Sequence, residues 1–322
     1  MDTKRNTRGN LLEYNKRVSM NIIGIQGAFS TEAMFMFPKH EDFKLIEYPE
    51  RHNHKADAYI QTNVLGVMKK KNAEKYQFIL DQNKPKIVIE QATFRKNLDI
   101  EKPDDYYFRV GLNHYTFSDG IFKNKNSPYD RWEQIQKEQD IEIKPWKKKG
   151  DYILILTQNP IDTSLNDLVK KPGDYENFIM NTINEISKYT DEDIMIRPHP
   201  RFTFRFNKDT LKDIKVKNKV FFSENLNNYN VTNGGEDLYK DFKNARVAIS
   251  YSSNSLTEAV CEGVPSIALS KTSHAWPVTY HTLEILKHKE LPQFDRTQWL
   301  YDCSYTQWKM SEINSGVVHK RL

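Results

Sequence analysis

Two series of short apolar segments run along the chain, and in each series the apolar segments alternate with segments of helical spacing. In the first series we predict strands at 21–27, 44–48, 58–60, 86–90 and 106–110, and helices at 73–80 and 129–139. Short apolar runs that alternate with helical segments are typical of parallel strands covered by helices. The pattern in residues 20–143 therefore predicts an α/β domain with a largely parallel sheet.

A second series follows residues 144–150, a polar linker with a proline and a terminal glycine. Within residues 151–285 we predict strands at 152–157, 193–197, 220–222, 247–250 and 266–269, and helices at 174–189, 237–244 and 255–262. The two series together predict two Rossmann-like α/β domains that face a cleft. We interpret residues 1–19 as a basic arm and residues 286–322 as a helical tail that packs back on the first domain.

The balance of charge limits the partners of this chain. The formal net charge is +5, which is mildly basic and short of what a dedicated DNA-binding protein carries. Basic residues nevertheless gather in the arm, at 69–71 and at 147–149. Such runs are either solvated surface or contacts to a polyanion such as nucleic acid.

The two cysteines, Cys261 and Cys303, lie far apart and form no Cys-x-x-Cys pair. This spacing argues against a disulfide scaffold or a zinc site and fits a reducing compartment. The N-terminus lacks the apolar stretch of a secretory signal, and no apolar run approaches the length of a membrane span. We therefore expect a cytoplasmic protein.

The first candidate motif is Ile196-Arg197-Pro198-His199-Pro200-Arg201, which ends a predicted strand. In open α/β sheets, ligands bind outside the carboxyl ends of the strands. The two prolines fix an extended turn and remove backbone donors, so the side chains of Arg197, His199 and Arg201 are the available donors. Guanidinium and imidazole groups suit a diphosphate whose charge must be balanced as a nucleotide leaves. The alternative is a structural turn with a surface histidine.

The second candidate motif is the turn Ser252-Ser253-Asn254-Ser255, which follows a predicted strand and opens a helix. Hydroxyl groups and free N–H groups at such a turn can hold a phosphate. Glu258, on the same helix, is placed to accept hydrogen bonds from ribose hydroxyls. The alternative is N-capping by Asn254 or Ser255, with Glu258 closing a capping box, and capping does not exclude phosphate binding. We predict that Ser252, Ser253, Asn254, Ser255 and Glu258 contact a nucleotide-sugar together with Arg197, His199 and Arg201.

Carboxylates in the first domain are candidates for the chemical step. Transfer of a sugar from the predicted nucleotide-sugar to an acceptor needs a carboxylate that deprotonates the acceptor hydroxyl or stabilises the reacting sugar. Glu90 is the first catalytic candidate and Asp119 the second; a strand-end carboxylate and a turn aspartate are their structural alternatives. Arg95 and Arg109 are candidates for contact with an acceptor phosphate or the donor, and His114 is a further candidate on the acceptor side.

The order of four short motifs resembles the donor-binding half of GT-B glycosyltransferases, in the group that contains capsular Kdo transferases and bacterial sialyltransferases. The motifs are His199-Pro200, Ser252-Ser253, Glu258-Ala259 and Gly263-Val264-Pro265. The resemblance covers roughly the C-terminal half of the chain. It implies a GT-B fold, a nucleotide-sugar whose phosphates contact the His-Pro and Ser-Ser elements, and an acidic base in the N-terminal domain, which supports Glu90 without fixing it.

The tail at 305–316 resembles the ending of glycosyltransferase-like proteins from tailed bacteriophages. Phage enzymes of this class often decorate hydroxymethylated pyrimidines, so the resemblance favours transfer to 5-hydroxymethylpyrimidine in phage DNA, within the host cytoplasm. A base in duplex DNA must be reached in the major groove or flipped out. The aromatic side chains at 106–108 and Tyr115 are candidates for stacking on it, with core packing as the alternative.

Two other functions stay open. One is a glycosyltransferase that acts on a surface polysaccharide or a lipid-linked glycan, and the other is a non-catalytic nucleic-acid-binding protein with a degraded GT-B fold. Asp191-Glu192-Asp193 superficially matches the carboxylate pair of metal-dependent glycosyltransferases, but we interpret it as solvated charge on the side away from the pocket. We expect no metal and no cofactor besides the nucleotide-sugar, because Arg197, His199 and the helix N-terminus would balance the leaving group.

Overall fold

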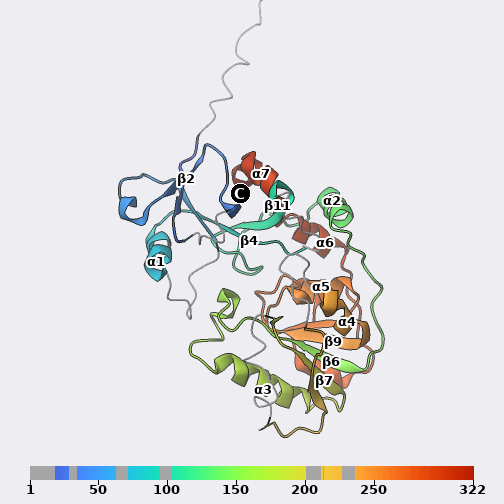
Figure 1. The fold of residues 1–322 in the computed structure, drawn as a ribbon. Coiled ribbons are helices and arrows are strands. Elements are labelled where there is room, and N and C mark those ends of the chain that lie inside the picture. The colour runs from blue at the N-terminus through green and yellow to red at the C-terminus, as the bar shows by residue number, and fades with distance from the viewer. Residues whose placement is uncertain are drawn as a thin grey trace, which may run out of the picture.

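The computed structural model describes residues 19–28, 35–62, 72–94, 103–200, 212, 214–226 and 236–322. Two separate sheets form the centres of two domains that lie one above the other in Figure 1. The predicted strands and helices of both series match observed elements closely, so the predicted α/β class with two Rossmann-like domains is confirmed. Some predictions concern residues outside the described part of the chain. These residues are Arg95, Arg201, the lysine run at 69–71 and nearly all of the basic arm.

The first sheet has the strand order β11-β5-β4-β3-β1-β2. Its strands are β1 (Ile22–Ile25), β2 (Phe43–Ile46), β3 (Ala58–Thr62), β4 (Lys86–Gln91), β5 (Tyr107–Leu112) and β11 (Gln307–Lys309). Strands β2, β1, β3 and β4 are parallel, whereas β5 runs antiparallel to β4. The sheet is therefore largely parallel with one reversed strand, and that strand brings a second set of side chains beside the end of β4.

Alternation along the first sheet separates its two cores. On one face, Ile22 and Ile60 pack in a cluster with Ile313 from the C-terminal segment. On the other face, Ile23 packs in a cluster with Ile79. Helix α1 (Ala73–Asp81) covers the second face, and α7 (Met310–Asn314) and α8 (Val317–Arg321) cover the first. Side chains on a strand alternate between the faces, so both faces need an apolar cover.

The second sheet is entirely parallel, with the strand order β10-β9-β6-β7-β8. Its strands are β6 (Tyr152–Leu156), β7 (Asp193–Arg197), β8 (Val220–Phe222), β9 (Ala245–Ser250) and β10 (Ser266–Ala268). In the central strand β6, Ile153 and Ile155 face α3 (Asp174–Ile186). The alternate residues Leu154 and Leu156 face α4 (Glu236–Asn244) and α5 (Ser255–Cys261). Helices therefore cover both faces of β6, which explains its continuous apolar run.

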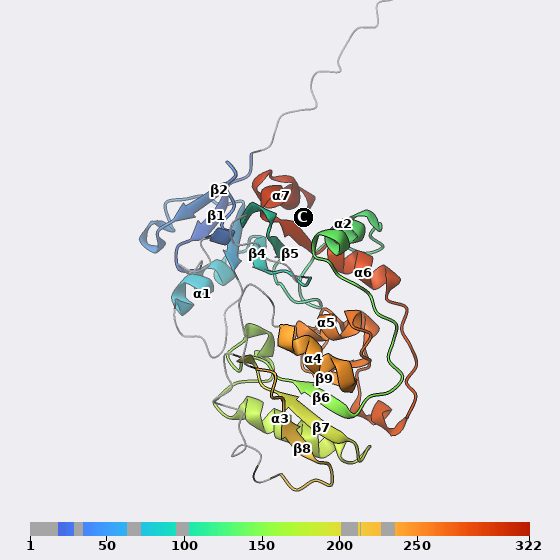
Figure 2. The ribbon, with the colours of Figure 1, turned by 45° about the vertical axis from the view of Figure 1, so that its right-hand side comes forward.

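The C-terminal segment connects the two domains (Figure 2). It contains α6 (Thr297–Ser304), which lies beside α2 (Asp130–Glu138), and then β11, which pairs antiparallel with β5 and places Trp308 opposite Phe108. His319 in α8 donates from Nε2 to the buried carboxylate of Asp42, 2.8 Å away. The tail, predicted as helical, thus also adds an edge strand to the first sheet.

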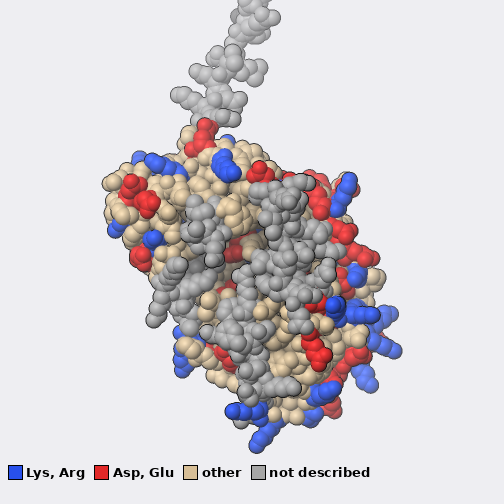
Figure 3. Space-filling view, in the orientation of Figure 1, with Lys and Arg blue, Asp and Glu red and all other residues tan. Residues whose placement is uncertain are grey.

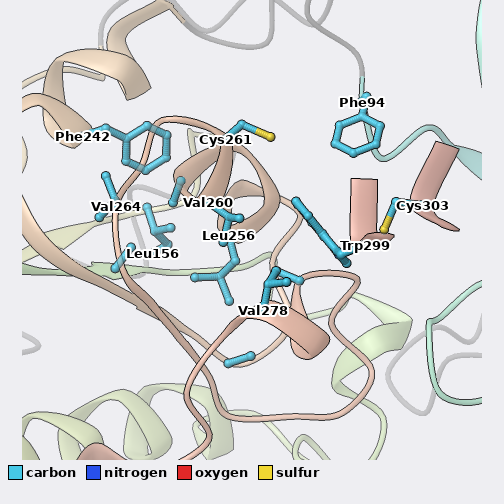
Figure 4. Packing of buried hydrophobic residues seen from close by; sticks show 14 of the residues in the cluster. Phe94, Leu156, Phe242, Leu256, Val260, Cys261, Val264, Val278, Trp299 and Cys303 are labelled. Atoms are coloured by element: carbon cyan, nitrogen blue, oxygen red, sulfur yellow. The ribbon is translucent and has the colours of Figure 1, made fainter. Parts of the chain in front are cut away.

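One apolar cluster crosses the boundary between the domains. Figure 4 shows Phe94 of the first domain, Trp299 and Cys303 of α6, and Leu256 and Val260 of α5 within this cluster. Burial of such shared apolar area favours a fixed arrangement of the two domains. No helix in the described part of the chain is long and apolar enough to cross a membrane.

Short 3-10 helices complete the described part of the chain. They are Tyr48–Glu50, Pro103–Asp105, Thr163–Leu165, Trp276–Val278 and Leu283–Lys287. The helix at Thr163–Leu165 follows the central strand β6 and begins with Asp162, whose carboxylate accepts from the backbone N–H of Ser164 at 2.8 Å. This cap holds a polar loop at the carboxyl end of the second sheet.

Candidate active site

A cavity of about 370 Å³ lies where the carboxyl ends of the second sheet face the first domain. Residues from both domains line it. Nine of the predicted site residues are among them, namely Glu90, Arg109, Arg197, His199, Ser252, Ser253, Asn254, Ser255 and Glu258. Two motifs that are far apart in the sequence therefore meet the end of β4 at one cavity.

The end of the central strand β6 holds the two motifs together. Thr157 Oγ1 accepts the backbone N–H of His199 at 2.8 Å, so one of the few backbone donors left by the two prolines is already used. Gln158 Oε1 accepts the backbone N–H of Ser252 at 2.8 Å, and Gln158 Nε2 donates to Ser252 Oγ at 3.1 Å. Both Thr157 and Gln158 line the cavity.

Arg197 has an anionic partner that the sequence did not reveal. Its Nη1 forms an ion pair with Asp241 of α4, a carboxylate with no exposed surface. Asp241 also accepts from Ser223 Oγ at 2.7 Å and from Asn225 Nδ2 at 2.6 Å, and Arg197 Nη1 donates to the carbonyl of Asn225 at 2.8 Å. Asp241 therefore offsets the charge that Arg197 was predicted to offer to a diphosphate.

The turn at 252–255 differs in detail from the predicted capping arrangement. Asn254 occupies the N-cap position of α5, but its side chain makes no capping bond; Nδ2 donates instead to the carbonyl of Thr93 at 2.8 Å, in the first domain. Ser253 Oγ accepts the backbone N–H of Ser255 at 3.2 Å. Because α5 has only seven residues, the hydroxyl groups of this turn, rather than a long helix dipole, are the groups that could bind an anion.

Glu258 lies one turn into α5 and lines the main cavity and a small adjoining cavity. Tyr239 of α4 makes a side-chain hydrogen bond with Glu258, and burial followed by the Glu258 charge raises the pKa of the Tyr239 hydroxyl. The phenol therefore stays protonated and donates to the carboxylate. This contact fixes Glu258 at the wall of the cavity, where the sequence predicted a ribose contact.

Glu90 and Arg109 stand directly opposite each other in the register of β4 and β5. Opposed residues in an antiparallel pair share one face of the sheet, and this face is the one that lines the cavity. Arg109 Nη1 donates to Thr93 Oγ1 at 3.3 Å, and the guanidinium lies 5.6 Å from the ring centroid of Tyr115. The first domain thus presents a carboxylate and a guanidinium side by side.

His274 is a buried titratable group at the cavity that the sequence reasoning missed. Its Nε2 lies 3.1 Å from the carbonyl of Tyr115, so this nitrogen carries the proton and donates across the domain boundary. Burial, together with the nearby charge of Arg109, holds the pKa of His274 well below its ordinary value. The ring is therefore neutral at physiological pH.

The structure does not bring Asp119 and His114 to the cavity, as far as its described lining shows. Asp119 is exposed and accepts from Thr116 Oγ1 at 3.0 Å and from Ser118 Oγ at 2.9 Å. His114 Nδ1 accepts the backbone N–H of Thr116 at 3.1 Å, and burial lowers the pKa of His114. Both side chains form hydrogen bonds within the turn that follows β5.

The acidic run at 191–193 lies at the start of β7, which is the opposite end of the sheet from the cavity. Asp191 forms an exposed ion pair with Lys217, and Glu192 pairs with the buried side chain of Arg246. Among the described residues, one group has the spacing of metal ligands: His40, Asp42 and His319. None of these three lines the cavity.

Four further groups that sequence reasoning missed share one signal. Thr157, Gln158, Asp162 and Ser164 all lie in the polar segment after the apolar run of β6. The rule that ligands bind at the carboxyl ends of parallel strands applies to β6 as much as to β7 and β9. Applying it to every strand would have identified this segment.

Comparison with known proteins supports the fold. The structure is similar to that of Thermosulfurimonas dismutans KpsC, beta Kdo 2,7 transferase, with a TM-score of 0.52 and 10% sequence identity over 94% of this chain and 100% of that chain. It also matches T. dismutans KpsC, beta Kdo 2,4 transferase, with a TM-score of 0.48 and 10% identity over 88% of this chain and 90% of that chain. No family model and no curated protein matches the sequence. The chain has the GT-B fold, in which two Rossmann-like domains face a cleft.

Proposed function

We propose that this protein is a glycosyltransferase that takes a sugar from a nucleotide-sugar and passes it to a hydroxyl of a polysaccharide or a lipid-linked glycan. The observation that carries the proposal is the single cavity lined by His199 and the turn at 252–255 from one domain and by Glu90 and Arg109 from the other. The likeness in fold to a structure described as a beta Kdo 2,7 transferase supports a glycan as the acceptor.

In this proposal the C-terminal domain holds the donor. The imidazole of His199 and the hydroxyls of Ser252 and Ser253 meet the phosphoryl oxygens, and Glu258 accepts from the ribose. Negative charge grows on the phosphate as the bond to the sugar breaks, and these donors stabilise it. In this proposal protein groups supply the stabilisation and no metal ion takes part.

The N-terminal domain acts on the acceptor in this proposal. Glu90 takes the proton of the attacking hydroxyl, or stabilises the positive charge that develops on the sugar ring. Arg109, opposite Glu90 in the register, is a second contact for an anionic acceptor. Catalysis then takes place between the two domains, where the acceptor hydroxyl and the donor sugar meet.

A DNA acceptor receives less support from the structure than a glycan. Of the four aromatic candidates, Tyr106 is half-buried, whereas Tyr107, Phe108 and Tyr115 are each at most 6% exposed. These three pack in the core and offer little face for stacking on a flipped base. On the face shown in Figure 3, Lys and Arg side chains lie along the edge of the C-terminal domain and in smaller groups on the N-terminal domain, with Asp and Glu side chains interspersed among them, so no continuous basic surface stands out. We therefore place 5-hydroxymethylpyrimidine DNA among the test acceptors and a glycan first.

The proposal is tested in two steps. Thermal shift with CMP, UDP and GDP, each at about 100 times its Kd, should add roughly 2.7 kcal/mol of stability for the matching nucleotide. The matching nucleotide-sugars, including activated Kdo, are then incubated with glycan acceptors and with hydroxymethylated duplex DNA, and products are read by mass spectrometry. Sugar transfer to a glycan is expected; transfer to DNA alone would replace the acceptor, and binding of no nucleotide would favour a non-catalytic protein.

A further inference from the structure

Gln158 makes five hydrogen bonds, among them a long one that its Oε1 accepts from Ser250 Oγ at 3.4 Å, and those of the side chain fix the orientation of its carboxamide. The backbone N–H of Gln158 donates to Tyr175 Oη at 2.6 Å, which anchors the residue to α3. The backbone N–H of Ser252 can only donate, so the atom facing it at 2.8 Å must be Oε1. Nε2 is therefore the atom that lies 3.1 Å from Ser252 Oγ and 3.2 Å from Ser164 Oγ. The Gln158 side chain is 7% exposed and has little freedom to turn over.

This orientation decides where two hydroxyl protons point. An amide N–H₂ group donates only, so Ser252 Oγ and Ser164 Oγ both act as acceptors toward Gln158. A serine hydroxyl has one proton, and that proton must then point away from the amide. Among the described residues, neither of these two protons has an acceptor in the protein. Ser164 and Ser252 both line the cavity, so their protons are free for a ligand that only accepts.

We infer that Ser164 and Ser252 form a two-hydroxyl clamp for a phosphoryl group of the donor, and that Gln158 is the positioning residue that directs both protons into the cavity. This inference rests on the proposed function and adds to it the residues Ser164 and Gln158, which lie outside the two sequence motifs. An ionised oxygen is the acceptor that gains most from two aligned O–H donors. Asp162, which accepts the backbone N–H of Ser164, keeps that hydroxyl at the cavity wall.

The test compares nucleotides with their nucleosides, because only the nucleotide carries the phosphoryl group. For wild-type protein, calorimetry gives the Kd of CMP, UDP and GDP and of cytidine, uridine and guanosine. Ser164→Ala should weaken binding of the matching nucleotide about tenfold, the loss expected for one hydrogen bond to a charged group. Binding of the nucleoside should stay unchanged. Ser311→Ala, on the exposed surface of α7, is the matched control and should change neither Kd.

Gln158→Glu tests the direction of the protons. The carboxylate can still accept the backbone N–H of Ser252, but its second oxygen accepts protons where the amide donated them. Both serine hydroxyls would then turn toward residue 158, and a negative charge would lie beside the phosphate. Nucleotide binding should fall about 100-fold, whereas Gln158→Met, which removes the bonds without reversing them, should lower it about tenfold. Circular dichroism checks that each variant is folded.

The outcomes separate this inference from the proposed function. If wild-type protein binds none of the three nucleotides, the proposed function and the clamp both fail. If wild-type protein binds a nucleotide and Ser164→Ala binds it equally well, the clamp alone is overturned. An equal loss for nucleotide and nucleoside would mean that Ser164 merely supports the loop, and this result would also overturn the clamp. A loss confined to the nucleotide, and larger for Gln158→Glu than for Gln158→Met, supports it.

Discussion

The side-chain amide of Asn254 spans the two domains, donating from Nδ2 to the backbone carbonyl of Thr93 at 2.8 Å. Thr93 in turn accepts from Arg109, which stands opposite Glu90 in the sheet. A short chain of contacts thus connects the donor-side turn with the candidate catalytic carboxylate. The Nε2 of His274 makes a second polar bridge, to the carbonyl of Tyr115.

Substitution of Asn254 should therefore affect turnover more than nucleotide binding. Asn254→Ala removes the donor to the carbonyl of Thr93 without adding a charge, while Gln158 still holds the turn through Ser252. We expect kcat to fall about tenfold, in line with the loss of a hydrogen bond, with little change in nucleotide Kd. Steady-state kinetics beside calorimetry measure both. A parallel loss of nucleotide affinity would contradict a role in linking the domains.

Replacing Glu90 should remove the chemical step and leave the donor bound. Glu90→Gln keeps the shape of the side chain but cannot take a proton, so kcat should fall about 10²- to 10⁴-fold. Nucleotide Kd should stay at the wild-type value. Asp119→Asn is the control, since Asp119 lies outside the cavity lining, and it should turn over at close to the wild-type rate. Near-normal activity of Glu90→Gln would move the catalytic role to another carboxylate at the cavity.

Breaking the ion pair between Arg197 and Asp241 should destabilise the C-terminal domain. Asp241→Asn leaves the buried guanidinium without its counter-charge, and loss of one partner of such a pair costs about 3–5 kcal/mol. Urea denaturation measures the free energy of unfolding. The surface pair of Glu185 and Lys188 is the control, and Glu185→Gln should leave the urea midpoint unchanged. An unchanged midpoint for Asp241→Asn would show that the pair contributes little to folding.

Stability should fall on mild acidification, in part because of His274. The pKa of His274 is lowered in the folded protein, chiefly by burial, so the unfolded chain binds the proton more readily than the folded one. The stabilisation is complete above the unfolded pKa of about 6.5 and is lost as the pH falls from there toward the folded pKa. The slope for one such group is about 1.4 kcal/mol per pH unit.

The control for this prediction is His274→Gln, which keeps an amide donor near the carbonyl of Tyr115 but cannot gain the charge. Denaturation of both proteins at a series of pH values between about 7 and 5 gives the two slopes. The variant should lose less stability with acid than the wild-type protein. Parallel curves would show that His114 and His319, whose pKa values are also lowered, account for the acid sensitivity instead.

Local patterns in the sequence predicted the elements well because they depend on neighbours along the chain. The apolar run of β6 and the spacing in α3 reflect burial directly, since every residue of β6 and every third or fourth residue of α3 faces a core. The positions of His199 and Ser252 followed from the rule for strand ends, and the structure places both at one cavity. The sequence by itself therefore determined two α/β domains and the end of the second sheet at which the cavity lies.

Only the tertiary structure decided how the side chains at that edge are partnered. Gln158 forms a hydrogen bond with Ser252, 94 positions away in the sequence, and Asn254 forms one with Thr93, 161 positions away. Asp241 neutralises Arg197, and Tyr115 enters the core instead of offering a stacking face. Such pairings depend on the order of the strands in each sheet and on how the two domains pack together. The local periodicity of the sequence does not specify either of these. The same residue types would give a different site if the strand order or the approach of the two domains were different.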